Sequence, residues 1–333
     1  MAVPLGVAFD GFIPTGEAID LARKAVDAGA KSLWMAEHLG YREATLTCMA
    51  FALSTERAML VPTAVSPYLW HPTPTAMAMA TLAEAAPGRA ALAVGVGNPL
   101  FLQESGKEMA KPVRAVREFV ECLRELWSGE AVHYEGEMFR LAGARMGFRP
   151  SSSIPIYIAA MGADMLRLSG RMADGVVLSA GLSVGFARHS LSIAAEGARQ
   201  AGRDPAQVRK AGYLHFAVSE DGKVAMELLR EKLAFLLRNK FLAQNIAFTG
   251  IPIDQEAIID AVARRDMAAA SRLVPDEAVE AFTVGGTPRQ CRERLQAYMD
   301  AGLEEPVLSI LGRAQDKILA LGILRELSAP SVR

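Results

Sequence analysis

The sequence predicts a single (β/α)8 barrel with insertions, occupying residues 1–333 as one domain. Eight short apolar runs alternate with helical segments along the chain. Most of these runs are nearly continuously apolar, which is typical of parallel strands covered on both faces. Repeated strand–helix alternation favours a closed parallel barrel. An open, doubly wound sheet remains the alternative. The chain length suits one barrel with insertions.

The strand-like runs set the order of the expected barrel. They are PLGVAF (4–9), SLWMAE (32–37), MLVPTAV (59–65), RAALAVGVG (89–97), IPIYIAA (154–160), GVVLSAG (175–181), KAGYLHFAVS (210–219) and PVLSILG (306–312).

Helical patterns fill the spaces between these runs. Residues 16–30 form an amphipathic segment that ends near Gly29. Residues 287–302 begin with Thr-Pro, an N-cap followed by a first-turn proline, and end in glycine. In the segment 111–127, apolar residues recur at steps of three and four, which places them on one helical face. They are Val113, Val116, Val120, Leu123 and Trp127.

Two segments interrupt the alternation. Residues 129–153 resemble an inserted hairpin and loop, and residues 239–284 an extra helical excursion before the last strand. We expect both to form much of the substrate wall.

Composition excludes several classes of protein. Lys and Arg number 36 and Asp and Glu 37, so a nucleic-acid partner or an anionic membrane surface is not expected. No apolar stretch is long enough to span a bilayer, and the N-terminus lacks a secretory signal. Cys48, Cys122 and Cys291 lie far apart, so we expect three small core residues and a cytoplasmic, reducing location.

In an α/β barrel, chemistry takes place where the strands end and the βα loops begin. His38 directly follows the second strand, and an imidazole there can give or take a proton near neutral pH. A structural, hydrogen-bonding histidine is the alternative. After the fourth strand come Gly95, Gly97 and Asn98. Glycines at such a position let the backbone approach a ligand, or simply let the chain turn.

The segment Ala160-Met161-Gly162 runs from the fifth strand directly into a helical pattern. Small residues at a helix N-terminus leave backbone N–H groups free for a phosphate. His71 precedes Pro72 and is expected at the entry of a helix. No HxH, HExxH or cysteine cluster occurs, so no metal site is expected. A glycosidase needs paired carboxylates across the mouth, and the strand exits do not supply them.

Taken together, these exits resemble the bacterial luciferase-like superfamily of flavin and deazaflavin oxidoreductases, and most of all its methylenetetrahydromethanopterin reductase-type branch. The resemblance covers nearly the whole chain in order. The matching pieces are Trp34-Met35-Ala36-Glu37-His38, Thr63-Ala64-Val65-Ser66-Pro67, His71-Pro72, Ala80-Thr81-Leu82, Gly88-Arg89, Gly95-Val96-Gly97, Lys111-Pro112-Val113, Ala159-Ala160-Met161-Gly162, Gly170-Arg171-Met172-Ala173-Asp174-Gly175 and Gly286-Thr287-Pro288.

The resemblance implies a cofactor ring in the barrel mouth and a homodimer. It places an acid/base at His38, a cis peptide backing the ring at Ala64–Val65, and the cofactor phosphate at Ala160, Met161 and Gly162. Gly95, Gly97 and Asn98 are expected to line the ring or ribityl side. One departure from the family pattern is Asn98-Pro99-Leu100, where many members carry a second glycine or an acidic residue.

Three functions fit the resemblance. The first expectation is an FMN-dependent monooxygenase acting on a small organic substrate, with a flavin reductase as the partner that supplies reduced FMN. The alternative is a coenzyme F420-dependent reductase or dehydrogenase that moves a hydride. The absence of an obvious basic cluster for a polyglutamyl tail favours FMN, whereas the branch resemblance favours F420. A flavin-binding protein without turnover is the third possibility, against which the presence of His38 counts.

Overall fold

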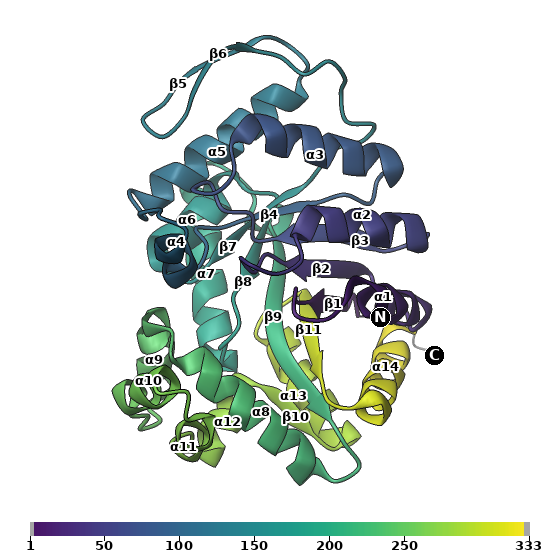
Figure 1. Cartoon of the computed structure of the whole chain (residues 1–333), viewed down its shortest axis with the longest axis vertical. Coiled ribbons are helices and arrows are strands. Elements are labelled where there is room, and N and C mark those ends of the chain that lie inside the picture. Colours follow the sequence, from purple (N-terminus) through teal and green to yellow (C-terminus); the bar gives the residue numbers. More distant parts are fainter. Residues whose placement is uncertain (1–2, 330–333) are drawn as a thin grey trace.

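All eight expected strands form, and they run parallel around a barrel (Figure 1). The computed structural model describes residues 3–329. The order around the sheet is β3-β2-β1-β11-β9-β8-β7-β4. The strands are β1 (Gly6–Phe9), β2 (Ser32–Ala36), β3 (Met59–Thr63), β4 (Leu92–Val94), β7 (Ile156–Ala160), β8 (Gly175–Leu178), β9 (Arg209–Val218) and β11 (Glu305–Leu311).

The barrel closes between β3 and β4. Parallel bridges join Leu60 to Ala90 and Val65 to Val94, so the two ends of the sheet meet. This closure confirms the barrel over the open sheet. One further strand, β10 (Val284–Gly286), pairs with the end of β9 and was not expected, because its Val-Gly-Gly sequence carries no β-type run.

The barrel interior is filled by small residues around two large rings. Trp34 and Tyr157 meet edge to face with their ring centroids 5.1 Å apart. The remaining interior positions are mainly alanine and valine: Ala8, Val61, Ala91, Ala93, Val177, Ala211 and Val307. Since the interior is packed, a ligand can bind only at one or the other end of the barrel and cannot pass through it.

Helices cover the outside of the barrel, and the expected ones form. Thr287 caps its helix through a reciprocal capping box with Gln290. Gly29 takes a φ of 101° just beyond the first helix, a conformation that glycine accepts readily. The helices are α1 (Thr15–Asp27), α2 (Ala44–Ser54), α3 (Pro72–Ala85), α4 (Pro99–Glu104), α5 (Pro112–Trp127), α6 (Ala163–Met172), α7 (Val184–Gln200), α8 (Gly222–Leu237), α13 (Pro288–Asp300) and α14 (Ala314–Ser328), with a 3-10 turn at Pro205–Gln207.

The first insertion is the expected hairpin, formed by β5 (Val132–Glu135) and β6 (Arg140–Ala144). The buried carboxylate of Glu118 on α5 accepts backbone N–H bonds from Glu137, Met138 and Phe139 at 3.2, 2.7 and 3.2 Å. The hairpin is thereby fixed to the outside of α5, at the top of the view in Figure 1.

The second insertion is the expected helical excursion, and it packs on α8. Its elements are a 3-10 turn at Lys240–Leu242, α9 (Ala243–Thr249), α10 (Gln255–Ala263), α11 (Met267–Arg272) and α12 (Asp276–Phe282). Their apolar side chains and those of α8 form a hydrophobic cluster of their own, separate from the cluster between barrel and outer helices. We call α9–α12 the helical module; it gathers at one side of the barrel in Figure 1.

The cis peptide lies one bond earlier than expected. It joins Thr63 to Ala64, so the expectation of a cis bond at Ala64–Val65 was wrong. Strand β3 ends at Thr63, whereas Val65 already pairs again with the neighbouring strand. The Val65 N–H donates to Ala93 at 2.9 Å, and its carbonyl accepts from Gly95 at 3.1 Å.

Two further expectations concern the core and the membrane. Cys48, Cys122 and Cys291 are all buried free thiols, as expected. Among residues 3–329, no helix has the length and apolar character needed to cross a bilayer.

Candidate functional site

A cavity of about 630 Å³ opens at the C-terminal ends of the strands. Seven of the residues expected at the site line it, from the ends of four segments that are far apart in sequence. They are His38, Ala64, Gly95, Gly97, Asn98, Met161 and Gly162.

Two expected cofactor residues point elsewhere. The side chains of Val65 and Ala160 are 3% and 2% exposed and pack in the hydrophobic core outside the barrel. Successive strand residues face opposite sides, so Ala159, next to Ala160, lines the cavity in its place.

His38 presents one ring nitrogen to the cavity. Its Nδ1 is buried and has no hydrogen-bond partner among the described residues, which leaves Nε2 as the nitrogen that can reach a ligand. Burial lowers the pKa of His38 below its ordinary value; Asp10 opposes this effect and Lys232 adds to it. The imidazole is therefore mainly neutral at pH 7 and can accept a proton.

The loop after β1 holds the His38 ring in place. Phe12 lies against it with ring centroids 4.8 Å apart, and Tyr41 meets the other side of Phe12 edge-on at 4.6 Å. The Arg42 guanidinium fixes this loop by donating to the carbonyls of Gly11 and Phe12 at 3.0 and 3.2 Å. The ring orientation of His38 is thus set by packing rather than by a hydrogen bond.

Glu37 is a site residue that the strand-end argument did not select. Its side chain lines the cavity beside His38, and its Oε2 accepts the Ala44 N–H at 3.1 Å. Burial raises the pKa of this carboxyl, with the Ala44 N–H bond acting in the opposite direction. The signal was present, because Glu37 and His38 together follow β2, where side chains no longer alternate between the barrel faces.

The glycines after β4 keep the cavity open. A Cβ on Gly95 would lie 3.0 Å from the Ala64 Cβ and 3.1 Å from the Ala159 Cβ, and Gly97 has a φ of 84°. Asn98 follows as the N-cap of α4, with its Oδ1 accepting the Leu100 N–H at 3.0 Å. The departure from the family pattern therefore starts a short helix at the cavity rim.

The start of α6 offers backbone donors to the cavity. Gly162 is the N-cap residue, no side chain caps this helix, and a Cβ at Gly162 would meet nothing within 4 Å. Uncapped first-turn N–H groups suit an anion. Helix α6 is held firmly, because Gly170 crosses α7 so closely that a Cβ there would lie 1.9 Å from the Ala194 carbonyl oxygen.

The second insertion, residues 239–284, supplies the expected wall on one side only. Asn239, Phe241, Leu242 and Gln244 line the cavity, whereas residues 129–153 contribute none of its lining residues. The hairpin is too far round the barrel, since Glu118 fixes it on the outside of α5.

The cavity matches the requirements of a ring cofactor with a phosphate. It combines a glycine-lined slot between Ala64 and Ala159, a free helix N-terminus, and one imidazole nitrogen directed inwards. Within residues 3–329, no group of three or more His, Cys, Asp or Glu side chains is arranged to hold a metal.

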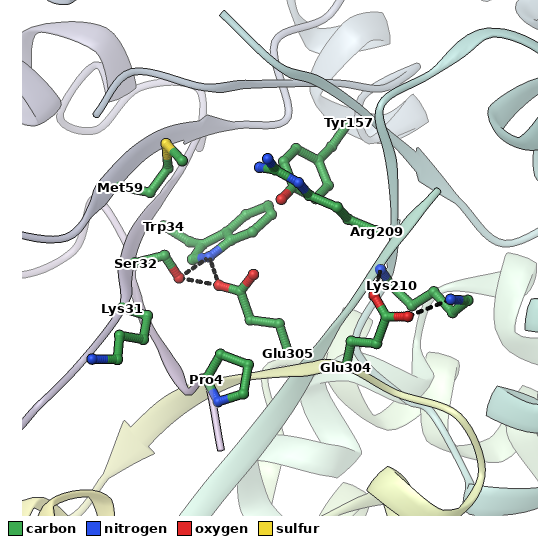
Figure 2. Close-up of a pocket in the computed structure, with 10 residues that line it drawn as sticks. All are labelled: Pro4, Lys31, Ser32, Trp34, Met59, Tyr157, Arg209, Lys210, Glu304 and Glu305. Atoms are coloured by element: carbon green, nitrogen blue, oxygen red, sulfur yellow. Dashed lines mark hydrogen bonds and ion pairs between the residues drawn. The ribbon is translucent and has the colours of Figure 1, made fainter. Parts of the chain in front are cut away.

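A second cavity, of about 280 Å³, lies at the opposite end of the barrel (Figure 2). There Trp34 Nε1 donates to Ser32 Oγ at 2.6 Å and to Glu305 at 3.2 Å, and Ser32 donates to Glu305. Lys210 pairs with Glu304. None of the residues that line this floor cavity is a glycine or the N-cap of a helix, so the mouth is the candidate site.

Comparison with known proteins agrees with the geometry. The 5,10-methylenetetrahydromethanopterin reductase of Archaeoglobus fulgidus is 31% identical over 303 residues, which cover 89% of this chain and 91% of that protein. The F420-dependent glucose-6-phosphate dehydrogenase of Rhodococcus erythropolis is 31% identical over 322 residues, which cover 92% and 90%.

The fold comparison points the same way. The structure of the coenzyme F420 dependent tetrahydromethanopterin reductase from Methanopyrus kandleri matches with a TM-score of 0.88 and 25% identity, covering 97% of this chain and 98% of that one. The family model for luciferase-like monooxygenases matches residues 7–305. The chain therefore belongs to the luciferase-like monooxygenase family and is an oxidoreductase.

Proposed function

We propose that this chain is a coenzyme F420-dependent reductase or dehydrogenase. One observation carries the proposal: the relatives that match it over about nine-tenths of its length include methylenetetrahydromethanopterin reductases and F420-dependent dehydrogenases. This reverses the preference for an FMN-dependent monooxygenase that the sequence alone suggested.

The residues at the mouth are those that such a cofactor needs. When bound, F420 supplies a ring carbon that exchanges a hydride with the substrate. The first turn of α6, starting at Gly162, would hold its phosphate. Gly95 and Gly97 leave room for the ring edge against Ala64 and Ala159.

His38 would move the proton that accompanies hydride transfer. Oxidation of an alcohol releases one proton from its hydroxyl group, and a neutral imidazole can accept it. The lowered pKa of His38 keeps it in that neutral form. Glu37 lies beside it as a second titratable group, with one carboxylate oxygen occupied by the Ala44 N–H.

A calorimetric titration with F420 and with FMN tests the proposal. We expect F420 to bind and Gly162→Asp to weaken it by at least about 10-fold, because the new carboxylate faces the phosphate and meets no protein atom. The matched control is Gly147→Asp, an exposed glycine that also has nothing within 4 Å. Binding of FMN alone would overturn the proposal in favour of the monooxygenase and its flavin reductase partner.

We also propose a homodimer formed through α2 and α3. Helix α2 carries no charged residue, and its Leu46 and Leu53 are 74% and 78% exposed. Tyr41 and Met77 beside them are 54% and 51% exposed. Such an apolar face is typical of an interface between copies. Sedimentation should show a dimer that Leu53→Glu dissociates and Ile318→Glu, at an exposed site on α14, does not.

A further inference from the structure

A third cavity, of about 400 Å³, lies next to the mouth between α8, α11 and the end of β11. Its walls are apolar, formed by Leu228, Phe235, Met267 and Leu311, and it contains two charged side chains, Glu231 and Lys232. Glu231 is exposed at the rim, whereas Lys232 is half-buried. Lys232 is therefore the more buried of the two charged residues on this mainly apolar surface.

The Lys232 ammonium has no ion-pair partner in the part of the chain that the structure describes. Its neighbours on and after α8 differ in this respect. Arg230 pairs with Glu227 and Asp276, and Lys240 pairs with Glu256. A half-buried cation without a counter-ion is unfavourable in the free protein and is available for an anionic ligand.

Lys232 is directed towards the reacting side of the mouth. Its Nζ lies 5.8 Å from the Phe12 ring centroid, and the Phe12 ring lies 4.8 Å from that of His38. Lys232 and the expected acid/base therefore both lie near the same aromatic ring. The Lys232 charge also contributes to lowering the pKa of both His38 and His215.

His215 adds a second unsatisfied group below this cavity. It is 6% exposed, and neither ring nitrogen has a hydrogen-bond partner among the described residues. It pairs in register with Ser309 on β11, two residues before Leu311 of the cavity wall. Burial lowers the pKa of His215 to about 3, so this imidazole stays neutral and leaves Lys232 as the local cation.

We propose that this cavity receives the charged end of an anionic substrate, a carboxylate or a phosphate, against Lys232 while the reacting carbon lies beside His38. The inference rests on the proposed function, because it assumes that a substrate is oxidised or reduced at His38. Lys232 would be a specificity-determining residue, since it binds the substrate away from the reacting atoms. The apolar walls would cover the carbon chain between the two ends.

Two matched pairs of secondary alcohols test the proposal, and they also separate carboxylate from phosphate. The pairs are 2-hexanol with 5-hydroxyhexanoate and 1,5-hexanediol with 5-hydroxyhexyl phosphate, in which a carbon chain separates the secondary alcohol from the other end of the molecule. Dissociation constants are obtained from ligand-induced shifts in melting temperature at constant ionic strength, with and without bound F420. We expect at least one anion to bind about 10-fold more tightly than its neutral twin, as a charged hydrogen bond typically allows.

The variants assign that preference to one side chain. Lys232→Met should abolish it without changing the affinity for the neutral twin, and Lys232→Arg should retain most of it. Lys223→Met, an exposed position at the start of the same helix, is the control and should behave as wild type. Absence of any anion preference in the wild type, or a preference that survives Lys232→Met, would overturn the proposal.

These outcomes are separate from those for the cofactor. Failure of F420 to bind overturns the proposed function, whereas the anion preference is still measured on the cofactor-free protein. Conversely, if F420 binds but the anion preference does not depend on Lys232, the proposed function stands and the proposed class of anionic substrate is wrong.

Discussion

At the floor of the barrel, polar side chains are satisfied by one another. Ser32, Trp34 and Glu305 form a closed set of hydrogen bonds, and Lys210 pairs with Glu304 (Figure 2). At the mouth, His38 Nδ1 is buried without a partner among the described residues. Around the adjoining third cavity, both ring nitrogens of His215 are buried without partners, and Lys232 has no counter-ion in the described chain. The same fold thus treats polar groups in two ways at its two ends.

The difference between the floor and the mouth indicates which end of the barrel serves stability and which end serves function. A satisfied buried polar network favours one packed arrangement, whereas an unsatisfied buried group is unfavourable and needs a reason to be present. Under the proposed function, that reason is the cofactor and substrate that the mouth would bind. Breaking the contrast at either end should therefore have different consequences.

The largest expected effect is on turnover, from His38→Asn. The amide keeps some hydrogen bonding but cannot carry a proton, so turnover of the alcohol that the wild type oxidises should fall by about 10²-fold or more. F420 affinity and melting temperature should change little, because Nδ1 makes no bond to the protein that could be lost. Preserved turnover, or a collapse of stability together with activity, would show that His38 is structural.

At the floor, Trp34→Phe should lower the stability of the fold and leave the mouth unaffected. It keeps a ring in the fully buried position but removes the indole N–H that Ser32 and Glu305 accept. We expect a loss of about 1–3 kcal/mol in the free energy of unfolding, measured by denaturant titration. F420 affinity at the mouth should stay the same. A weakened F420 affinity would mean that the two ends are coupled.

The pH dependence at the mouth should move in opposite directions in two variants. The proposed base, His38, has a lowered pKa, so the acid limb of kcat/KM should lie below the ordinary histidine value of about 6.5. The Asp10 carboxylate raises the pKa of His38, so Asp10→Asn should move the limb to lower pH. Lys232 lowers it, so Lys232→Met should move the limb to higher pH. If the acid limb moved in neither variant, His38 would not be the group that titrates.

The smallest expected effect is a pH-dependent stability at the floor. Burial raises the pKa of Glu305, and the bonds from Ser32 and Trp34 and the charge of Arg209 only partly oppose it. A raised pKa means that the folded chain holds this proton more tightly than the unfolded chain. The resulting stability is present below the unfolded pKa and is lost as pH rises through the folded pKa.

Glu305→Gln should therefore raise the melting temperature at neutral pH, and the difference from wild type should shrink towards acidic pH. Glu304→Gln, at an exposed carboxylate, is the matched control, and it should not show this trend. If the melting temperature of the wild type rose relative to that of Glu305→Gln as the pH increased, the raised pKa of Glu305 would be contradicted.

The sequence predicted the barrel well because strand period and helix period are local properties. The runs at 32–37 and 59–65 and the helical pattern at 111–127 carry their own signal, and they form β2, β3 and α5. Strand ends then select the mouth, which is how His38, Gly95 and Gly162 were found. The strand-end argument did not say which way the side chains of Val65 and Ala160 point, because one residue of register decides which face a strand residue occupies, and both are buried.

Lys232 could not have been found in this way. It lies in the middle of α8, where a lysine on a helix is most simply a solvated side chain. Only the packing of α8 across the mouth brings its ammonium over Phe12. The short strand β10 was missed for a related reason, since it is held by pairing with β9 rather than by its own composition.

The helical module has a consequence for how this protein can diversify. The chain leaves the barrel after α8 and returns at β10, and the helices between them bury their apolar faces largely against α8 and one another. A segment with its own core can be lengthened, shortened or replaced without repacking the barrel. Exchange of residues 239–283 between relatives should therefore transfer substrate preference as a unit, and the proposed hydride chemistry at the strand ends should stay unchanged.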